Sequence, residues 1–281
     1  MDVLVVDAFA TEPMAGRPVA VFPDADLTGD QYRAVAEELG AAGALAAEPD
    51  GLYAVGARAD VALAVAAGAL VERGRDPGPA TVRGPRDLEA AFAADGTVTV
   101  ELPAAESRPV EVSESEVADA LGVDRAALAD VGADLPMARV SAGAGYLAVP
   151  VNFMEHLGNA DPDREWVAGV LDETDTEALY AFTFDTLAAE TDWNARVFTR
   201  EGEVATSARA AAAAAGYVRR QGALDADRES LVAASGHFID RPSRVRVELA
   251  GAGPTVAGTA LPVFDGTVTV PEPDEDDILE V

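Results

Sequence analysis

The sequence predicts an α+β protein built from two similar domains, each a curled mixed sheet around a central helix. Its 281 residues are enough for two domains of ordinary size. Short β-branched runs recur in both halves, and each half also contains one long helical segment of small apolar residues. A helix that is apolar on almost every side must be buried, and a surrounding sheet can bury it.

In the first half, Val3–Val6 is a β-branched run typical of a buried strand, and Val19–Phe22 predicts its partner. Thr28 and Gln31 have the spacing of a capping box, which opens an amphipathic helix ending at Leu39. The other elements predicted here are a weak strand at Ala41–Ala47, the central helix at Asp60–Glu72, and strands at Thr81–Arg83 and Thr97–Leu102.

The Pro-, Glu- and Ser-rich stretch 103–112 predicts a boundary, with domains at 1–105 and 113–270 and an acidic tail at 271–281. The prediction allows a late strand of the second half to pair with strands of the first domain. The elements predicted after the boundary are a helix opened by Ser113 and Glu116, strands at Tyr146–Val151, Leu179–Phe184 and Ala195–Thr199, a helix at Trp166–Leu171, the second central helix at Thr206–Arg220, and late strands at Arg244–Leu249, Val256–Val263 and Thr267–Val270.

The charge excludes several classes of partner. The chain has 50 Asp and Glu residues against 20 basic ones, a formal net charge of −30. A surface this acidic repels phosphate backbones and anionic lipids, so neither a nucleic-acid nor a membrane partner is expected. The acid at Asp2 and the short apolar run after it do not fit a signal peptide, which favours a cytoplasmic protein.

Two residue types are missing. There is no cysteine, which excludes disulfides, thiolate metal sites and cysteine nucleophiles. There is also no lysine: every basic side chain is Arg. Since concentrated salt screens the repulsion between excess carboxylates, the composition indicates the intracellular protein of a halophile, although drift in an Ala-, Val- and Asp-rich genome is an alternative.

A set of motifs occurs in the order found in one family. Val6-Asp7-Ala8-Phe9 precedes Pro13, Gly16 and Pro18-Val19-Ala20-Val21; the later pieces are Val140-Ser141-Ala142-Gly143, Tyr146 to Pro150, Arg196 to Thr199, Arg241 to Arg244 and Val256 to Ala260. Together they resemble the PhzF-like family of isomerases, named for phenazine biosynthesis, which has the diaminopimelate-epimerase fold. The reaction of diaminopimelate epimerase itself is excluded because it needs two cysteines.

The resemblance implies a homodimer with no metal or organic cofactor, and a cleft between the two domains for a small carboxylic metabolite. In the family, one Glu in an "SETaF" segment moves a proton between carbon atoms. Loops at the N-termini of the two central helices hold the substrate's anion, which agrees with helix-dipole physics.

This sequence differs from the family at the residues that would carry out the reaction. Ala42 stands at the position of the catalytic Glu and Ala41 at the neighbouring Ser. The first anion loop carries Asp60 and Val61 in place of its Gly and His, and the second lacks its Asp-Pro pair. Proton transfer is therefore predicted to be lost. The alternatives are an active isomerase whose acid/base has moved to Asp60 or Glu203, and a non-catalytic structural partner in a dimer.

Each remaining candidate has a structural alternative. Asp60, Thr206 and Ser207 fit helix caps as well as a substrate site. Arg209, beside the second loop, is a candidate carboxylate ligand. Arg17, which stands where the family has Asn, could clamp a carboxylate, but in so acidic a chain pairing with a protein acid is favoured. Glu203 is read as a solvated loop residue unless its side chain points inward.

Metal binding is not predicted. His156 and His237 are the only histidines, and no His or Glu lies near either at metal-ligand spacing.

Overall fold

The computed structural model describes residues 1–56, 60–129, 131, 135–225, 228–270 and 272. The chain forms two compact units. Unit 1 contains Met1–Ala8, Arg17–Val98 and the residues from Thr259, and unit 2 contains Phe9–Gly16 and Thr99–Gly258. The domain limits 1–105 and 113–270 stay a prediction. The chain passes from unit 1 to unit 2 after Val98 and returns to unit 1 at Thr259. The predicted tail lies almost wholly outside the described residues.

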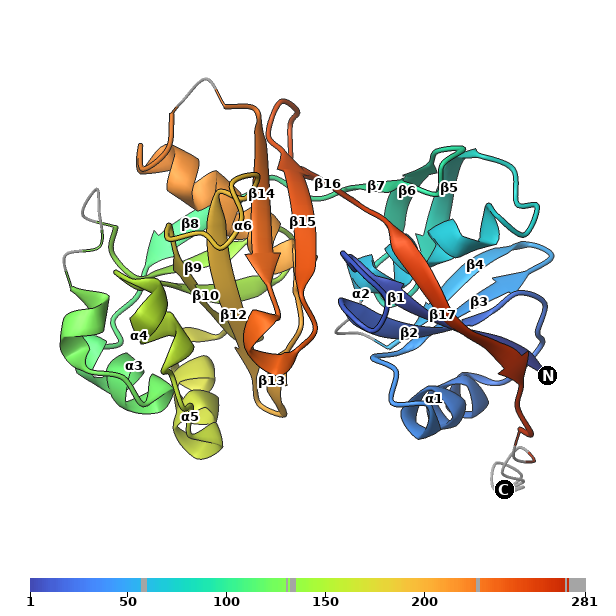
Figure 1. Cartoon of the computed structure of the whole chain (residues 1–281), viewed down its shortest axis with the longest axis horizontal. Coiled ribbons are helices and arrows are strands. Elements are labelled where there is room, and N and C mark those ends of the chain that lie inside the picture. Colours follow the sequence, from blue (N-terminus) through green and yellow to red (C-terminus); the bar gives the residue numbers. More distant parts are fainter. Residues whose placement is uncertain (57–59, 130, 132–134, 226–227, 271, 273–281) are drawn as a thin grey trace, which may run out of the picture. The chain divides into compact units, whose positions relative to one another are not determined.

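Unit 1 is a mixed sheet around a short helix (Figure 1). In spatial order its strands are β17 (Ala260–Thr267), β1 (Asp2–Ala8), β2 (Arg17–Phe22), β3 (Ala44–Glu48), β4 (Gly51–Val55), β5 (Gly78–Arg83) and β6 (Leu88–Phe92). The pairs β2–β3 and β4–β5 are parallel, and the others are antiparallel. Helix α2 (Asp60–Ala66) contacts β1, β2, β3, β4, β6 and β17, so the strands surround it.

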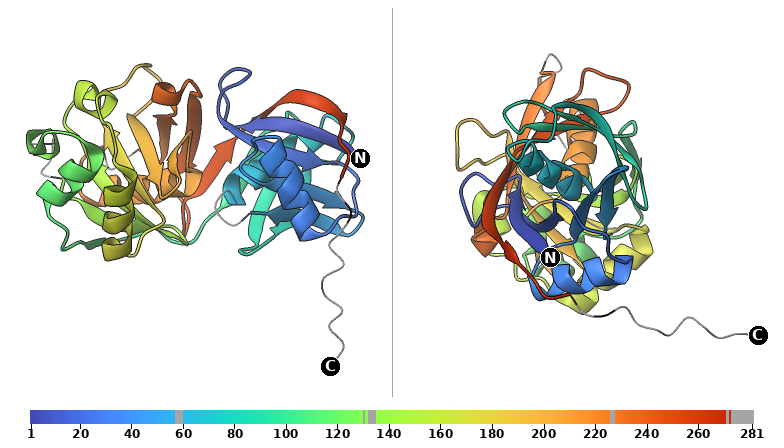
Figure 2. Two further views of the ribbon diagram at one scale, coloured as in Figure 1. Left: turned by 90° about the horizontal axis from the view of Figure 1, so that it is seen from below. Right: turned by 90° about the vertical axis from the view of Figure 1, so that its right-hand side faces the viewer.

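The outer face of this sheet carries helix α1 (Gly29–Glu38), the blue helix in front of the sheet in the left view of Figure 2. Thr28 and Gln31 make the predicted capping box. Tyr32, Val35 and Ala36 on one side of the helix pack with side chains of β2 and β3 in a single apolar cluster. The amphipathic pattern therefore identified both the helix and its buried face.

The first central helix is shorter than predicted. Instead of continuing to Glu72, it ends at Ala66 and tightens into a 3₁₀ turn, η1 (Ala67–Leu70). A Cβ at Gly68 would lie 2.4 Å from the carbonyl oxygen of Gly96, so the helix and the turn before β7 (Val98–Glu101) are in direct backbone contact. That approach requires glycine and leaves no space for a regular continuation.

Unit 2 repeats the plan with a longer helix. In spatial order its strands are β8 (Glu106–Pro109), β9 (Ala138–Ser141), β10 (Gly145–Pro150), β11 (Ala178–Thr183), β12 (Trp193–Thr199), β14 (Ser230–Ser235), β15 (Ser243–Glu248), β16 (Thr255–Gly258) and β7, with β13 (Gly202–Val204) paired to β12. Helix α6 (Ala208–Arg220) contacts strands from both ends of this order, namely β8, β9, β10, β15 and β16. Every residue from Ala208 to Val218 is buried, as expected for a helix enclosed by a sheet.

The outer layer of unit 2 is made of α3 (Glu114–Leu121), the 3₁₀ turn η2 (Arg125–Leu128), α4 (Met154–Gly158) and α5 (Arg164–Thr174). Helices α3 and α5 share one apolar cluster with β10 and β11. A further 3₁₀ turn, η4 (His237–Ile239), follows β14. The predicted fold class is confirmed: the protein is α+β, with mixed sheet curled around a central helix in each unit.

The late strands differ from the prediction. Val256–Val263 is divided at Thr259 between β16 in unit 2 and β17 in unit 1, and β17 ends at Thr267 where a strand was predicted to begin. Strand β17 pairs along the whole of β1, with a bulge opposite Val5 and Val6. The β-branched residues of 267–270 led to a strand with the wrong limits, because the limits of β17 are set by its pairing with β1 and not by local composition.

Candidate functional site

Ala42, which the motif alignment places at the family's catalytic Glu, lies on a turn fixed by backbone hydrogen bonds. Helix α1 ends in a Schellman motif: Gly40, at φ +65°, donates to the carbonyl of Glu37 and Ala41 donates to that of Ala36, at 3.0 and 2.8 Å. The N–H of Ala42 then donates to the carbonyl of Pro18 at 2.8 Å. Ala42 is thereby held just before β3 and beside Pro18 of β2, with its methyl group half-buried.

This turn packs closely on the strand that precedes the central helix. A Cβ at Gly43 would lie 2.8 Å from the carbonyl oxygen of Val55 and 3.2 Å from the side chain of Leu63 on α2. Gly56, at φ +123°, lies beside both Ala42 and Gly43. The backbone at position 42 thus approaches the segment leading into α2, but the side chain there has no titratable group.

Two charged residues lie near the same end of unit 1. Arg17 begins β2 and pairs with Ala8, one residue from the Asp7–Pro18 pair. Asp7 is a carboxylate that is only 1% exposed, directly after the apolar run Val3–Val6 of β1. Sequence reasoning used Asp7 only as part of a motif, although an acid directly after a β-branched run is itself an unusual signal. Asp60 is the first residue of α2, and its side chain lies outside the described residues.

In unit 2 the corresponding loop has kept polar side chains. Ser207 is the N-cap of α6, and its hydroxyl accepts from the N–H of Ala210 at 3.3 Å. Thr206 is buried just before it. Arg209 is 3% exposed and donates from Nη1 to the carbonyl of Ala142 at 2.7 Å. The guanidinium lies against Gly143, where an added Cβ would be 2.6 Å from Nη1. Arg209 therefore connects the start of α6 to the turn between β9 and β10.

Glu203 is not a solvated loop residue, and that expectation is wrong. Its carboxylate receives two hydrogen bonds from Arg196, at 3.1 and 2.6 Å, and the two side chains are only 10% and 8% exposed. Arg196 also donates to the carbonyls of Leu157 and Ala160, and its guanidinium lies over the rings of Phe198 and Phe238. The β12–β13 hairpin brings both residues together because Glu203 pairs with Phe198, and Arg196, two residues along β12, lies on the same face as Phe198. Glu203 is a structural ion-pair partner.

The first and last sequence motifs meet inside unit 2. The segment 9–16 is held by Arg241, whose Nε and Nη2 donate to the carbonyls of Gly16 and Ala15 at 2.8 and 3.0 Å. Phe9, buried at φ +60°, accepts from the N–H of Arg244. Its ring occupies the space where Gly258 would carry a Cβ. These motifs therefore hold the backbone of segment 9–16 in place. Sequence reasoning did not anticipate this role, because Arg241 and its partners are more than 220 residues apart in the sequence.

A second buried polar contact joins the loop before α6 to the same region. The hydroxyls of Ser235 and Ser243 lie 3.0 Å apart, and Ser243 also approaches the carbonyl of Ala205 at 3.2 Å. Gly236, at φ +77°, leaves no room for a Cβ between the carbonyls of Arg241 and Ala205. The loop position is thus set by β14 and β15.

Neither histidine belongs to a metal cluster in the described part of the chain, where no group of three or more His, Cys, Asp or Glu side chains could hold an ion. His156 Nδ1 lies 2.6 Å from Asn152 Oδ1. His237 is half-buried in η4. Burial, and secondarily the charge of Arg244, lower the pKa of His237. Over the same described residues, no helix is long and apolar enough to span a membrane.

Comparison with known proteins identifies the fold. No family model matches the sequence. An uncharacterised isomerase of Bacillus subtilis is 26% identical over 162 residues, 56% of this chain and 53% of that protein. The chain therefore spans about half the length of the curated relative that it matches.

Solved structures match over nearly the whole chain. A PhzF-family phenazine biosynthesis protein of Bacillus anthracis superposes with a TM-score of 0.81 at 20% identity, covering 95% of this chain and 99% of that one. A predicted epimerase of Pseudomonas aeruginosa gives 0.76 at 23%, covering 95% and 98%. A hydroxyproline epimerase of Agrobacterium vitis gives 0.54 at 14%, covering 95% and 90%. The predicted resemblance is confirmed at the level of fold: the chain has the fold shared by these PhzF-family phenazine biosynthesis proteins and epimerases.

Proposed function

We propose that this chain is a PhzF-like isomerase-family protein that binds a small carboxylic acid but has lost the family's proton transfer. The likeness to an isomerase of Bacillus subtilis and to structures named as epimerases supports the class of protein. The observation that carries the loss is Ala42. It occupies the position that the motif alignment assigns to the catalytic Glu, on a turn whose backbone is fully tied down.

The chemical reason is simple. A methyl group neither accepts nor donates a proton, and general acid–base catalysis contributes roughly 10²–10⁴-fold to a rate. Glu203 offers no replacement, because its carboxylate is engaged by Arg196. Asp60 remains the rival acid/base, at the first residue of α2.

Carboxylate binding is supported by the N-terminus of α6. The first N–H groups of a helix lie outside its own hydrogen-bond ladder and its N-terminal end carries a positive dipole, both of which favour an anion. We infer that Thr206, Ser207 and Arg209 form the anion subsite in unit 2, and Arg17 stays a candidate carboxylate ligand of unit 1. The cleft implied by the family and the homodimer are parts of this proposal. The acidic, lysine-free composition supports a further part, that the protein works in a salt-filled cytoplasm.

Deuterium exchange tests the loss of activity. The purified protein is incubated in D₂O at high salt with small unsaturated and hydroxy acids, and deuterium at carbon is followed by NMR. The wild type is expected to incorporate none. Ala42→Glu restores the missing carboxylate and is expected to gain exchange, whereas Ala42→Gln, of similar size without an acid, is the matched control.

Exchange by the wild type would overturn the proposed loss. If Asp60→Asn then abolished that exchange, the protein would be an active isomerase with a relocated base. Mass measurement at high salt tests assembly: a homodimer is expected, and its isolation as the sole species would count against the mixed-dimer alternative.

A further inference from the structure

A cavity of about 290 Å³ lies in unit 2, away from the N-terminus of α6. It is bounded by the edge strand β8, by β9, by the connection from β8 to α3, and by the last turn of α5. Its lining contains two arginines, two glutamates and a short apolar wall. Its volume is at the lower end of the range of small-molecule sites.

The two arginines face the cavity from neighbouring strands. Arg108 on β8 and Arg139 on β9 are directly opposite each other in the antiparallel register. Directly opposed side chains lie on one face with Cβ atoms about 5 Å apart, where like charges repel. The side chain of Arg108 makes no hydrogen bond or ion pair with any residue that the structure describes. A carboxylate between the two guanidinium groups would relieve the repulsion and accept charge-assisted hydrogen bonds from both.

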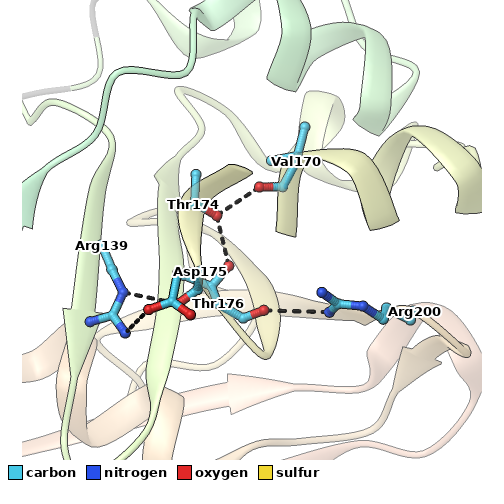
Figure 3. A network of polar contacts seen from close by, with 6 residues as sticks. All are labelled: Arg139, Val170, Thr174, Asp175, Thr176 and Arg200. Carbon is cyan, nitrogen blue, oxygen red and sulfur yellow. Dashed lines mark hydrogen bonds and ion pairs between the residues drawn. The ribbon is translucent and has the colours of Figure 1, made fainter. Parts of the chain in front are cut away.

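Arg139 is fixed in place before any ligand arrives. Its Nε donates to the carbonyl of Asp175 at 3.0 Å, and its Nη2 contacts the carboxylate of Asp175 at 3.2 Å (Figure 3). The guanidinium lies against Gly145, where an added Cβ would be 2.5 Å from Nη2. Within the described part of the chain, Nη1 has no hydrogen-bond partner. The arginine is therefore preorganised and still has a donor to offer.

The segment that holds Arg139 is itself rigid. Asp175 caps α5 in the left-handed conformation, at φ +52°. Figure 3 shows Arg139 and Arg200 reaching segment 174–176 from opposite sides. The buried hydroxyl of Thr174, which lines the cavity, donates to the carbonyl of Val170 at 2.7 Å and contacts Thr176 at 2.8 Å.

The rest of the lining favours a cation and an aliphatic group. Glu111 and Glu173 are exposed, and neither side chain makes a hydrogen bond or ion pair within the described part of the chain. Glu173 is in the last turn of α5, where the helix dipole also favours positive charge. Pro109, Val110 and Val112 supply the apolar wall.

We propose that this cavity binds a free aliphatic α-amino acid. The carboxylate bridges Arg108 and Arg139, the ammonium group faces Glu111 and Glu173, and the side chain packs on the two valines. A simple anion would meet two glutamates and a simple cation two arginines, so a small zwitterion fits the lining better than either. The site does not depend on the proposed function at α6.

Calorimetry at fixed ionic strength tests the site with three matched probes. L-leucine carries both charges, 4-methylpentanoate lacks the ammonium group, and 3-methylbutylamine lacks the carboxylate. Leucine is expected to bind at least tenfold more tightly than either analogue. Arg108→Gln, on an exposed side chain, is expected to weaken leucine binding about tenfold or more. Arg125→Gln is the matched control, because Arg125 is an exposed arginine of unit 2 paired with Glu114 outside the cavity.

Three results would overturn the proposal. One is the absence of leucine binding at millimolar concentration. Another is equal binding of either analogue, which would mean that only one charge is recognised. The third is unchanged leucine affinity in Arg108→Gln. Arg139→Gln, combined with a thermal melt to establish that it folds, provides a second measurement on the other guanidinium.

Discussion

The turn before β3 in unit 1 and the loop before α6 in unit 2 differ in what holds them. At Ala42 the bonds are made by backbone groups, through the Schellman motif and Pro18. Before α6, side chains hold the loop: Ser207 caps the helix, Arg209 reaches Ala142, and Ser243 reaches Ala205.

This difference distinguishes residues that hold the structure from residues that could take part in a reaction. A side chain at position 42 is not needed to hold its turn, so its replacement costs the fold little. The polar side chains before α6 are needed for packing whether or not the protein is catalytic. Polar residues retained in unit 2 are therefore weak support for activity, and a methyl group in unit 1 is strong support for its loss. The predictions below test this division, from the largest expected effect to the smallest.

Glu203→Gln is expected to have the largest effect on stability. It leaves the buried guanidinium of Arg196 without its counter-charge, and breaking a buried pair costs about 3–5 kcal/mol. Denaturant unfolding at fixed salt measures the loss. The control is Asp172→Asn, which breaks the exposed pair with Arg200 and should cost at most about 1 kcal/mol. Equal losses in the two variants would show that Glu203 has no structural role.

Two turns can be compared directly by replacing, in each, a glycine of positive φ with alanine. Gly40→Ala, in open space in unit 1, should cost about the 1–2 kcal/mol of a left-handed alanine. Gly143→Ala should cost more, because its Cβ would also displace the guanidinium of Arg209. The free energy of unfolding of each variant decides this. A smaller loss for Gly143→Ala than for Gly40→Ala would contradict the structural role assigned to Arg209.

Local patterns predicted much of the fold. The capping boxes at Thr28 and Ser113, the apolar face of α1 and the buried central helices all follow from nearest-neighbour chemistry. The limits of β17 did not, because that strand depends on a partner about 260 residues away in sequence. Strand β8, exposed at every position, has no hydrophobic alternation to reveal it.

The site was predictable only in part. Ala42 was singled out by aligning motifs, but its turn was not predicted, because a strand was expected over Ala41–Ala47 and β3 begins only at Ala44. The burial of Glu203 was not predictable, since it depends on the β12–β13 register that faces it toward Arg196. The arginine pair of β8 and β9 was missed for the same reason: cross-strand neighbours are invisible until the pairing is known.

Ser207→Ala tests whether the cap alone orders the loop before α6. Loss of an N-cap hydroxyl costs about 1 kcal/mol. Thr28→Ala, at the N-cap of α1, is the counterpart in unit 1 and should cost a similar amount. Thermal melts of both variants provide the comparison. A loss several times larger at Ser207 would mean that its hydroxyl holds more of the loop than the cap.

The smallest effect is expected from His237, at the η4 turn between β14 and β15. Its pKa is lowered, first by burial and then by Arg244, whereas in the unfolded chain the imidazole titrates near 6.5. Below that pH the unfolded chain binds more protons than the folded one, so the contribution of neutral His237 to stability is present above about pH 6.5 and is lost as the pH falls through the lower folded pKa. His237→Gln should therefore lose less unfolding free energy than the wild type between pH 7 and pH 5. NMR titration of the imidazole gives the direct measurement: Arg244→Gln should move the pKa upward by removing the smaller cause, and a wild-type pKa at or above 6.5 would contradict the burial argument.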